Sequence, residues 1–350
     1  MTADSAFRTH ARTQAGWCDA LGSPFTALLC RLIADRLDPA GAMALRLDPL
    51  PNNHAADATV LRLTGALHAQ VRQGRAPMLA ALYPPAPLPD PQALWAALEP
   101  VLADPALLPW LDSAPQTNEV ARSGVLMPGM MVVAAETGLP LRLFELGASA
   151  GLNLRLDHYR YRLGTLETGP ADAPLLLAPV WQGADPPGAT VRVVARAGVD
   201  LNPLDVGSAD DARRMLAYVW PDQRERLARM EAAIAAARAD PPPLTRGDAA
   251  DFVEAKVAPE AGAATVVFHS IAFQYFPKNV QARIAAHMAA MGARASAQAP
   301  LAWLRFEFDA VDPDAVAAGQ PPTLRLTLWP DGRERLLATV HPHGAMVHWH

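Results

Sequence analysis

The stretch Leu141-Arg-Leu-Phe-Glu-Leu146, followed by Gly147-Ala-Ser-Ala-Gly151, decides the fold. A short apolar run of this kind is typical of a strand, and it leads directly into a glycine turn. Glycines permit both a tight turn and the close approach of a ligand to the backbone. We expect a helix to begin after the turn, because backbone N–H groups and the helix dipole then point at a bound ligand. The stretch therefore predicts a ligand site at the end of a strand.

The sequence on the two sides of this stretch differs in pattern. Before it, only helices are predicted, and Ser23-Pro24 and Asp90-Pro91 are typical of helix starts. The last of these helices is expected to bend at Pro128 and to stop at Gly138. After it, strand and helix patterns alternate. The helices expected before this stretch are 25–37, 57–73, 92–103 and 117–136. The strands expected after it are 190–195, 264–268, 301–308, 323–329, 334–340 and 345–349. The helices expected after it are 210–219, 222–238 and 278–291.

These patterns predict an α/β protein in two parts. Residues 1–138 form an all-helical N-terminal module on the substrate side. Residues 139–350 form a Rossmann-like sheet that is mostly parallel, with an antiparallel hairpin at the C-terminus. An insertion near residues 159–189 separates the first two strands of that sheet. We expect the helical module to cover the site and to select the substrate.

The residues around the turn fit a site for S-adenosylmethionine. Glu145 to Gly151 matches an E-x-G-x-[GS]-x-G loop, over which the methionine end of that cofactor lies. An acid at the end of the next strand binds the ribose hydroxyls, and a third strand end flanks the adenine. The Glu145–Asp200 spacing exceeds the usual distance of about 20 residues, which the insertion explains. The expected cofactor contacts are Glu145, Gly147, Ala148, Ser149, Gly151, Asn153, Asp200, Asn202, Asp248 and Ala249.

Two other interpretations of the turn remain open. Gly147-x-Ser149-x-Gly151 also matches the nucleophile elbow of serine hydrolases. Asp309 and His341 then follow in the chain order of such a triad, but no strand is predicted before the elbow, where that fold has several. The turn can also be a purely structural link between a strand and a helix.

The sequence resembles a bacterial family of unknown function, DUF2332, over nearly its whole length. The resemblance lies in Glu145-Leu-Gly-Ala-Ser-Ala-Gly-Leu-Asn153-Leu, with further matches at 117–119, 157–161, 200–205, 269–270 and 341–344. The resemblance implies a class I methyltransferase fold that follows an N-terminal helical region. It does not assign an enzymatic activity. Compared with well-characterised methyltransferases, Ser149 replaces the usual middle glycine. The Asn/Asp-Pro-Pro-Tyr segment of amino-group methylation is also missing.

Further polar residues are expected near the site. His269 ends a predicted strand, where it would act as the base for a methyl acceptor, with Tyr275 closing the pocket. The alternative is a hydrogen-bonded structural histidine. Asn118, Glu119 and Arg122 would form a polar lip on the substrate side, or simply a helix cap and a surface ion pair.

Composition excludes several classes of function. The formal net charge of −5 gives no basic footprint for nucleic acid. No apolar run is long enough to span a membrane. Two cysteines, Cys18 and Cys30, fit a reducing compartment, and we expect a cytoplasmic protein. No metal is expected, because no Cys, Asp or Glu completes a set with His341, His343, His348 and His350.

The sequence as a whole favours a methyltransferase that uses S-adenosylmethionine and acts on a small molecule. A serine hydrolase using Ser149 is the first alternative. A protein that keeps the fold for ligand sensing or partner binding, without catalysis, is the second. The sequence does not identify the methyl acceptor or any protein partner.

Overall fold

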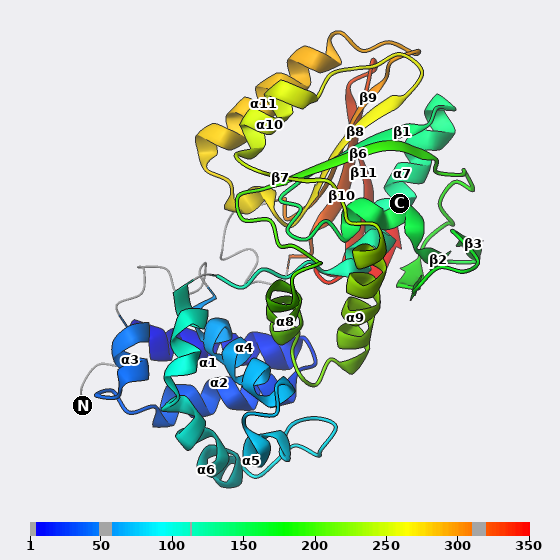
Figure 1. Cartoon of the computed structure of the whole chain (residues 1–350). Coiled ribbons are helices and arrows are strands. Elements are labelled where there is room, and N and C mark those ends of the chain that lie inside the picture. The colour runs from blue at the N-terminus through cyan, green and yellow to red at the C-terminus, as the bar shows by residue number, and fades with distance from the viewer. Residues whose placement is uncertain (1–4, 49–57, 113, 310–319) are drawn as a thin grey trace. The chain divides into compact units, whose positions relative to one another are not determined.

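The computed structural model describes residues 5–48, 58–112, 114–309 and 320–350 (Figure 1). The chain forms two compact units. The first comprises Met1–Thr117 and Ser208–Glu231, and the second comprises Asn118–Gly207 and Ala232–His350. The sequence predicted a boundary at 138/139, and the compact units divide instead at 117/118. A later segment also joins the first unit.

The first unit is helical. Two of its helices begin as expected, because proline occupies the first turn of both, and the Asp90 carboxylate caps the second by accepting from Gln92 N and Ala93 N. The expected start at Asp57 lies outside the described residues. The elements are α1 Ala6–Ala20, α2 Pro24–Arg36, α3 Ala42–Leu47, α4 Thr59–Arg72, α5 Pro77–Ala80, α6 Pro91–Leu102, η1 Pro105–Asp112, α8 Ala209–Ala217 and the first part of α9 Arg224–Ala239.

Polar contacts explain why residues 208–231 belong to the helical unit. The Asp222 carboxylate accepts a hydrogen bond from Phe25 N at 2.9 Å and one from the Ser23 hydroxyl. Ser23 precedes α2 but does not cap it with its own side chain. Asp222 therefore supplies, from a distant part of the sequence, the acceptor that the start of α2 needs.

The second unit is built on a nine-stranded sheet, and the mostly parallel sheet with antiparallel C-terminal strands that the sequence predicted is confirmed. Its order is β5-β12-β11-β10-β9-β8-β1-β6-β7, and β9, β8, β1, β6 and β7 run parallel. Strands β10, β11 and β12 continue the sheet in antiparallel pairs. The strands are β1 Leu141–Leu146, β5 Val180–Gln182, β6 Val193–Asp200, β7 Leu244–Arg246, β8 Ala264–Ser270, β9 Leu301–Glu307, β10 Thr323–Trp329, β11 Arg333–Val340 and β12 Met346–Trp349. Strands β5 and β7 were not among the predicted strands.

Helices cover both faces of the sheet. On one face, Phe144, Val267 and Trp303 pack with α10 Ala249–Lys256 and α11 Lys278–Gly292. On the other, Gly129 of α7 lies so close to β9 that an added Cβ would be 2.6 Å from a methyl of Leu304. Helix α7 spans Ser123–Thr137, later than the expected start at 117, because the short 3-10 turn η2, Val120–Arg122, precedes it.

The glycine turn is not followed by an α-helix, and this corrects the sequence prediction. The chain enters η3, Asn153–His158, a 3-10 segment interrupted at Arg155 by φ −101° and ψ 21°. The insertion follows at once and forms a small sheet of order β3-β2-β4. Its buried Tyr159 donates its hydroxyl proton to Leu152 O at 2.8 Å, which holds the chain in this path. The small strands are β2 Arg160–Leu163, β3 Leu166–Thr168 and β4 Leu176–Leu177.

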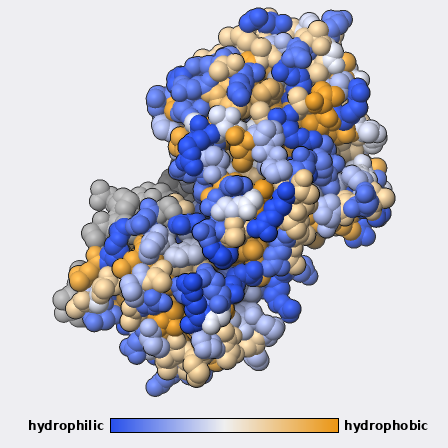
Figure 2. All heavy atoms as spheres, in the orientation of Figure 1, coloured by the Kyte–Doolittle hydropathy of each residue, from blue (hydrophilic) through white to orange (hydrophobic). Residues whose placement is uncertain are grey.

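The surface of both units mixes hydrophilic and hydrophobic residues in the view of Figure 2. None of the helices in the described ranges has the length and apolar character needed to cross a membrane.

We predict that Phe268→Ala destabilises the sheet unit by about 3–5 kcal/mol, because the ring is fully buried in β8 and its loss leaves a cavity. Chemical denaturation of the full chain followed by circular dichroism measures this change. Val180→Ala is the control, since Val180 is 63% exposed, and it should change stability by about 0.5 kcal/mol or less. Equal effects of the two substitutions would contradict this description of the core.

Candidate functional site

The carboxyl ends of three adjacent parallel strands each bring a carboxylate to one edge of the sheet. Glu145 lies in β1, Asp200 ends β6, and Asp248 follows β7. The pairing of β1 with β6, and of β6 with β7, places these ends side by side. In open α/β sheets this edge, next to the point where the strand order reverses, is where ligands bind. Here the reversal lies between β1 and β8.

The glycine turn uses most of its N–H groups inside the protein. Gly147 N and Ala148 N both donate to the carbonyl oxygen of Val199, at 2.9 and 3.0 Å. Gly151 N donates to Ala148 O at 2.7 Å. The sequence had assigned these donors to a ligand, and the structure does not offer them in this conformation.

Packing and backbone conformation explain the glycines of the turn. Gly147 and Gly151 have φ of +69° and +70°, a region that favours glycine. An added Cβ would lie 2.7 Å from the Ala272 Cβ at the first position, and 2.7 Å from the Pro242 Cγ at the second. Ser149 also has a positive φ, +52°, which is strained for a residue with a side chain.

Asp200 joins the glycine turn to the loop after β6. Its Oδ2 accepts from Ser149 N at 2.9 Å, and its Oδ1 accepts from Asn202 N at 2.8 Å. The Asn202 side chain in turn accepts a 2.8 Å bond from Arg246 at the end of β7. Three strand ends are thus linked by polar contacts through the expected ribose-binding acid. Asp248 caps α10 by accepting from Ala250 N and Asp251 N.

Glu145 is buried beside this network. Burial raises the pKa of its carboxyl well above the usual range, and the charge of Asp200 raises it further. A hydrogen bond from the Leu154 backbone and the charge of Arg122 oppose that rise in the pKa. Glu145 Oε2 and the Ser149 hydroxyl are both buried without a hydrogen-bond partner. Burying a polar atom without a hydrogen bond lowers the stability of the folded protein, so two such atoms mark this turn as unusual within the core.

The predicted substrate-side residues lie in the sheet unit. Asn118 and Glu119 are buried, so the expected surface ion pair is wrong for Glu119. Asn118 Oδ1 accepts from Leu152 N at 2.8 Å, and Arg122 donates to Ser270 O at 2.9 Å. The segment therefore ties the glycine turn to the end of β8.

Asn153 is buried and held from the same side. Its Oδ1 accepts a 2.8 Å hydrogen bond from the Ser123 hydroxyl at the start of α7. Ala148 and Ala249 are also buried and contribute no polar side chain. The structure thus brings together Glu145, Asp200, Asn202, Ser149, Asn118, Arg122 and Asn153.

His269 is fully buried and uses both ring nitrogens. Trp303 Nε1, which can only donate, lies 3.1 Å from His269 Nε2, so the ring proton sits on Nδ1 and is donated to Glu307 Oε1 at 2.7 Å. Phe273 stacks on the ring at 4.8 Å between centroids. This geometry does not support the expected role as a base and favours a structural histidine.

Tyr275, which was expected to close the pocket, is 66% exposed.

The residues of a serine-hydrolase triad are occupied elsewhere. Asp309 accepts two bonds of 2.8 Å from Arg325. His341 Nδ1 accepts from His343 N at 3.2 Å, and the Ser149 hydroxyl is without a partner. In the described part of the chain, no base is therefore poised to activate Ser149.

The C-terminal histidines contact polar neighbours. His348 Nδ1 lies 3.2 Å from the Gln182 side chain, and His350 Nε2 lies 3.0 Å from the Thr339 hydroxyl. Within the described ranges, no group of three or more His, Cys, Asp or Glu residues is placed to hold a metal ion.

A shallow pocket of about 220 Å³ adjoins the glycine turn. Ala150, Leu204, Asp205 and Pro242 are among the residues that line it. It lies between the turn, the loop after β6 and the loop before β7.

Sequence reasoning missed Glu307 and Ser123. Glu307 Oε1 accepts from Ala272 N and Phe273 N as well as from His269, and so organises the loop after β8. The signal was a lone acid near the end of a mostly apolar strand, Leu301–Phe308. Ser123 gave no local signal, because its role depends on Asn153, 30 residues away.

The comparison with protein families decides the relationship of this chain. A family model described as "Uncharacterized protein conserved in bacteria (DUF2332)" matches residues 8–349. The chain belongs to the DUF2332 family. No curated protein matches it. A solved structure titled "DhpI-SAM-HEP complex" is 14% identical, with 65% of this chain and 84% of that chain covered and a TM-score of 0.19. That score is too low to show a shared fold.

We predict that Glu145 makes the protein less stable as pH rises. Because the folded-state pKa is raised, the native state holds more protons than the unfolded state above the unfolded pKa, near 4.5. The stability that protonated Glu145 contributes is therefore fully present below that pH. It is lost as the pH rises through the pKa of Glu145 in the folded protein. Glu145→Gln, which resembles the protonated acid, should remove this slope.

The measurement is the melting temperature of both proteins across a pH series. Asp172→Asn, at an exposed position of the insertion, is the matched control and should keep the wild-type slope. An unchanged slope in Glu145→Gln would show that Glu145 is ionised in the native state.

Proposed function

We propose that this DUF2332 protein binds S-adenosylmethionine at the carboxyl edge of its sheet and transfers the methyl group to a small molecule. The observation that supports this most is the order of carboxylates: Glu145, Asp200 and Asp248 lie on three adjacent strand ends. A ligand that carries an ammonium group, a ribose diol and a purine in that order along its length would match this order of carboxylates.

The adenosine end fits the side chains that are present. The Asp200 carboxylate is partly exposed at the end of β6, where it can accept from ribose hydroxyls. Asp248 and the first turn of α10 lie one strand further out, on the side of the adenine. The pocket at Ala150 and Leu204 lies between the glycine turn and the loop that follows Asp200 and Asn202.

The methionine end fits two unpaired polar atoms. The ammonium of a bound ligand would favour the ionised form of Glu145, whose Oε2 then accepts from it, and the Ser149 hydroxyl is a donor suited to a carboxylate. Both atoms are buried in this conformation, and the N–H groups of Gly147 and Ala148 are engaged with Val199. Binding therefore requires the turn to open, and the side chains, rather than the backbone N–H groups, provide the recognition.

The chemistry depends on positioning. S-adenosylmethionine, when bound, supplies an electrophilic methyl group, and an in-line displacement needs an oriented acceptor and a dry site. Phe273 packs on both Phe276 and Trp303, and Phe276 lies beside Gly147, so the three rings form an apolar wall there. His269 supports this wall through Glu307 and Trp303 and does not take the acceptor's proton.

We predict that S-adenosylhomocysteine binds the full chain with a micromolar Kd, near −8 kcal/mol. Isothermal titration calorimetry measures this binding. Asp200→Ala and Gly147→Val should abolish it, the first by removing the ribose acceptor and the second by forcing a side chain against Ala272. Asp172→Ala is the control and should bind as the wild type does. Circular dichroism verifies that each variant is folded.

Each contrary outcome has a distinct meaning. No binding by a folded wild-type protein would overturn the proposal, and labelling of Ser149 by a fluorophosphonate would then favour a hydrolase. Binding that survives both substitutions would place the ligand elsewhere. Binding without turnover on any acceptor would favour a ligand sensor.

A further inference from the structure

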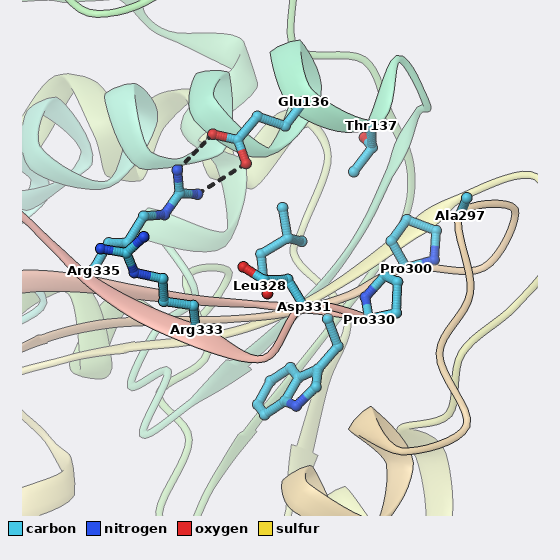
Figure 3. Close-up of a pocket in the computed structure, with 10 residues that line it drawn as sticks. Glu136, Thr137, Ala297, Pro300, Leu328, Pro330, Asp331, Arg333 and Arg335 are labelled. Carbon is cyan, nitrogen blue, oxygen red and sulfur yellow. Dashed lines mark hydrogen bonds and ion pairs between the residues drawn. The ribbon is translucent and has the colours of Figure 1, made fainter.

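A second cavity lies at the opposite edge of the sheet, where the parallel strands begin. Its volume is about 420 Å³, which lies within the range of small-molecule pockets, roughly 300–1,000 Å³. It is formed by the end of α7, the residues before β9, and the turn between β10 and β11 (Figure 3). It shares no residue with the carboxyl edge described above.

The wall of this cavity is apolar and preformed. Leu328, Trp329, Pro300 and Pro330 contribute to it. The indole of Trp329 packs against α11, on the other face of the sheet from α7, since an added Cβ on Gly292 would lie 2.4 Å from its Nε1. The side chain of Leu328 and the rigid rings of Pro300 and Pro330 thus form the apolar wall. A ligand's hydrocarbon part would therefore meet a surface that needs little rearrangement.

The charges on the rim are of two kinds. Arg335 is neutralised by Glu136, with two N–O distances of 2.7 and 2.9 Å, shown as dashed lines in Figure 3. Arg333 lies two residues earlier in β11 and so faces the same side of the strand. In the described part of the chain, neither Arg333 nor Asp331 forms an ion pair or a side-chain hydrogen bond. One unpaired cation and one unpaired anion thus line the same cavity.

We propose that this cavity binds a free α-amino acid with an apolar or aromatic side chain. The ligand's carboxylate pairs with the Arg333 guanidinium, which offers a planar fork for it, and its ammonium pairs with Asp331. The side chain lies against Leu328, Pro300 and Pro330. A simple anion would meet the carboxylate of Asp331, and a simple cation would meet two arginines, so a zwitterion matches the rim best.

The test is calorimetry on the full chain with L-leucine and L-phenylalanine as probes. N-acetyl-L-leucine lacks the ammonium and L-leucine methyl ester lacks the carboxylate. We expect the free amino acids to bind and each blocked form to bind about tenfold or more weakly, since each loses a charge-assisted hydrogen bond. Equal affinity for N-acetyl-L-leucine, or no binding of either amino acid at millimolar concentration, would overturn the proposal.

Variants locate the ligand. Arg333→Ala and Asp331→Asn should each weaken binding about tenfold or more, for the same reason. Arg192→Ala, at an exposed arginine outside the cavity, is the matched control and should leave the affinity unchanged. Asp200→Ala should also leave it unchanged, which separates this site from the proposed cofactor site. Loss of binding in Asp200→Ala with retention in Arg333→Ala would overturn the proposal.

Discussion

The Asp200 carboxylate is the interaction on which the carboxyl edge depends. It accepts one N–H from the glycine turn and one from its own loop, so it fixes the ends of β1 and β6 against each other. Hydrogen bonds to a charged group contribute about 1.5–3 kcal/mol each. Burial raises the pKa of the neighbouring Glu145, and the charge of Asp200 raises it further. One side chain therefore fixes the shape of the turn and adds to the effect of burial on the acid beside it.

The fold was largely predictable from local patterns. The apolar run at Ala264–Phe268, the alternation after Leu141 and the Asp90-Pro91 cap each indicate an element that the structure contains. The absent α-helix after the turn was not predictable in this way. In its place the chain forms the 3-10 segment η3, and the hydroxyl of Tyr159 in the insertion bonds back to Leu152 across that segment.

The candidate site was predictable as a set of acids but not as a set of contacts. Strand ends in chain order indicated Glu145, Asp200 and Asp248, and the strands that carry or precede them pair side by side in the sheet. That Gly147 N and Ala148 N are engaged by Val199 depends on pairing across strands, which a single sequence does not show. The same holds for His269, whose role follows from Trp303 and Glu307, 34 and 38 residues away.

Hydrogen exchange tests the central claim most directly, namely that Asp200 closes the turn and a ligand opens it. The full chain is measured with and without S-adenosylhomocysteine. The account predicts slow exchange at Gly147, Ala148 and Ser149 in the free protein, because their N–H groups are bonded. It also predicts a change on ligand addition that is confined to residues 145–152 and 200–202. Fast exchange in the free protein, or bound ligand with no change in these residues, would contradict it.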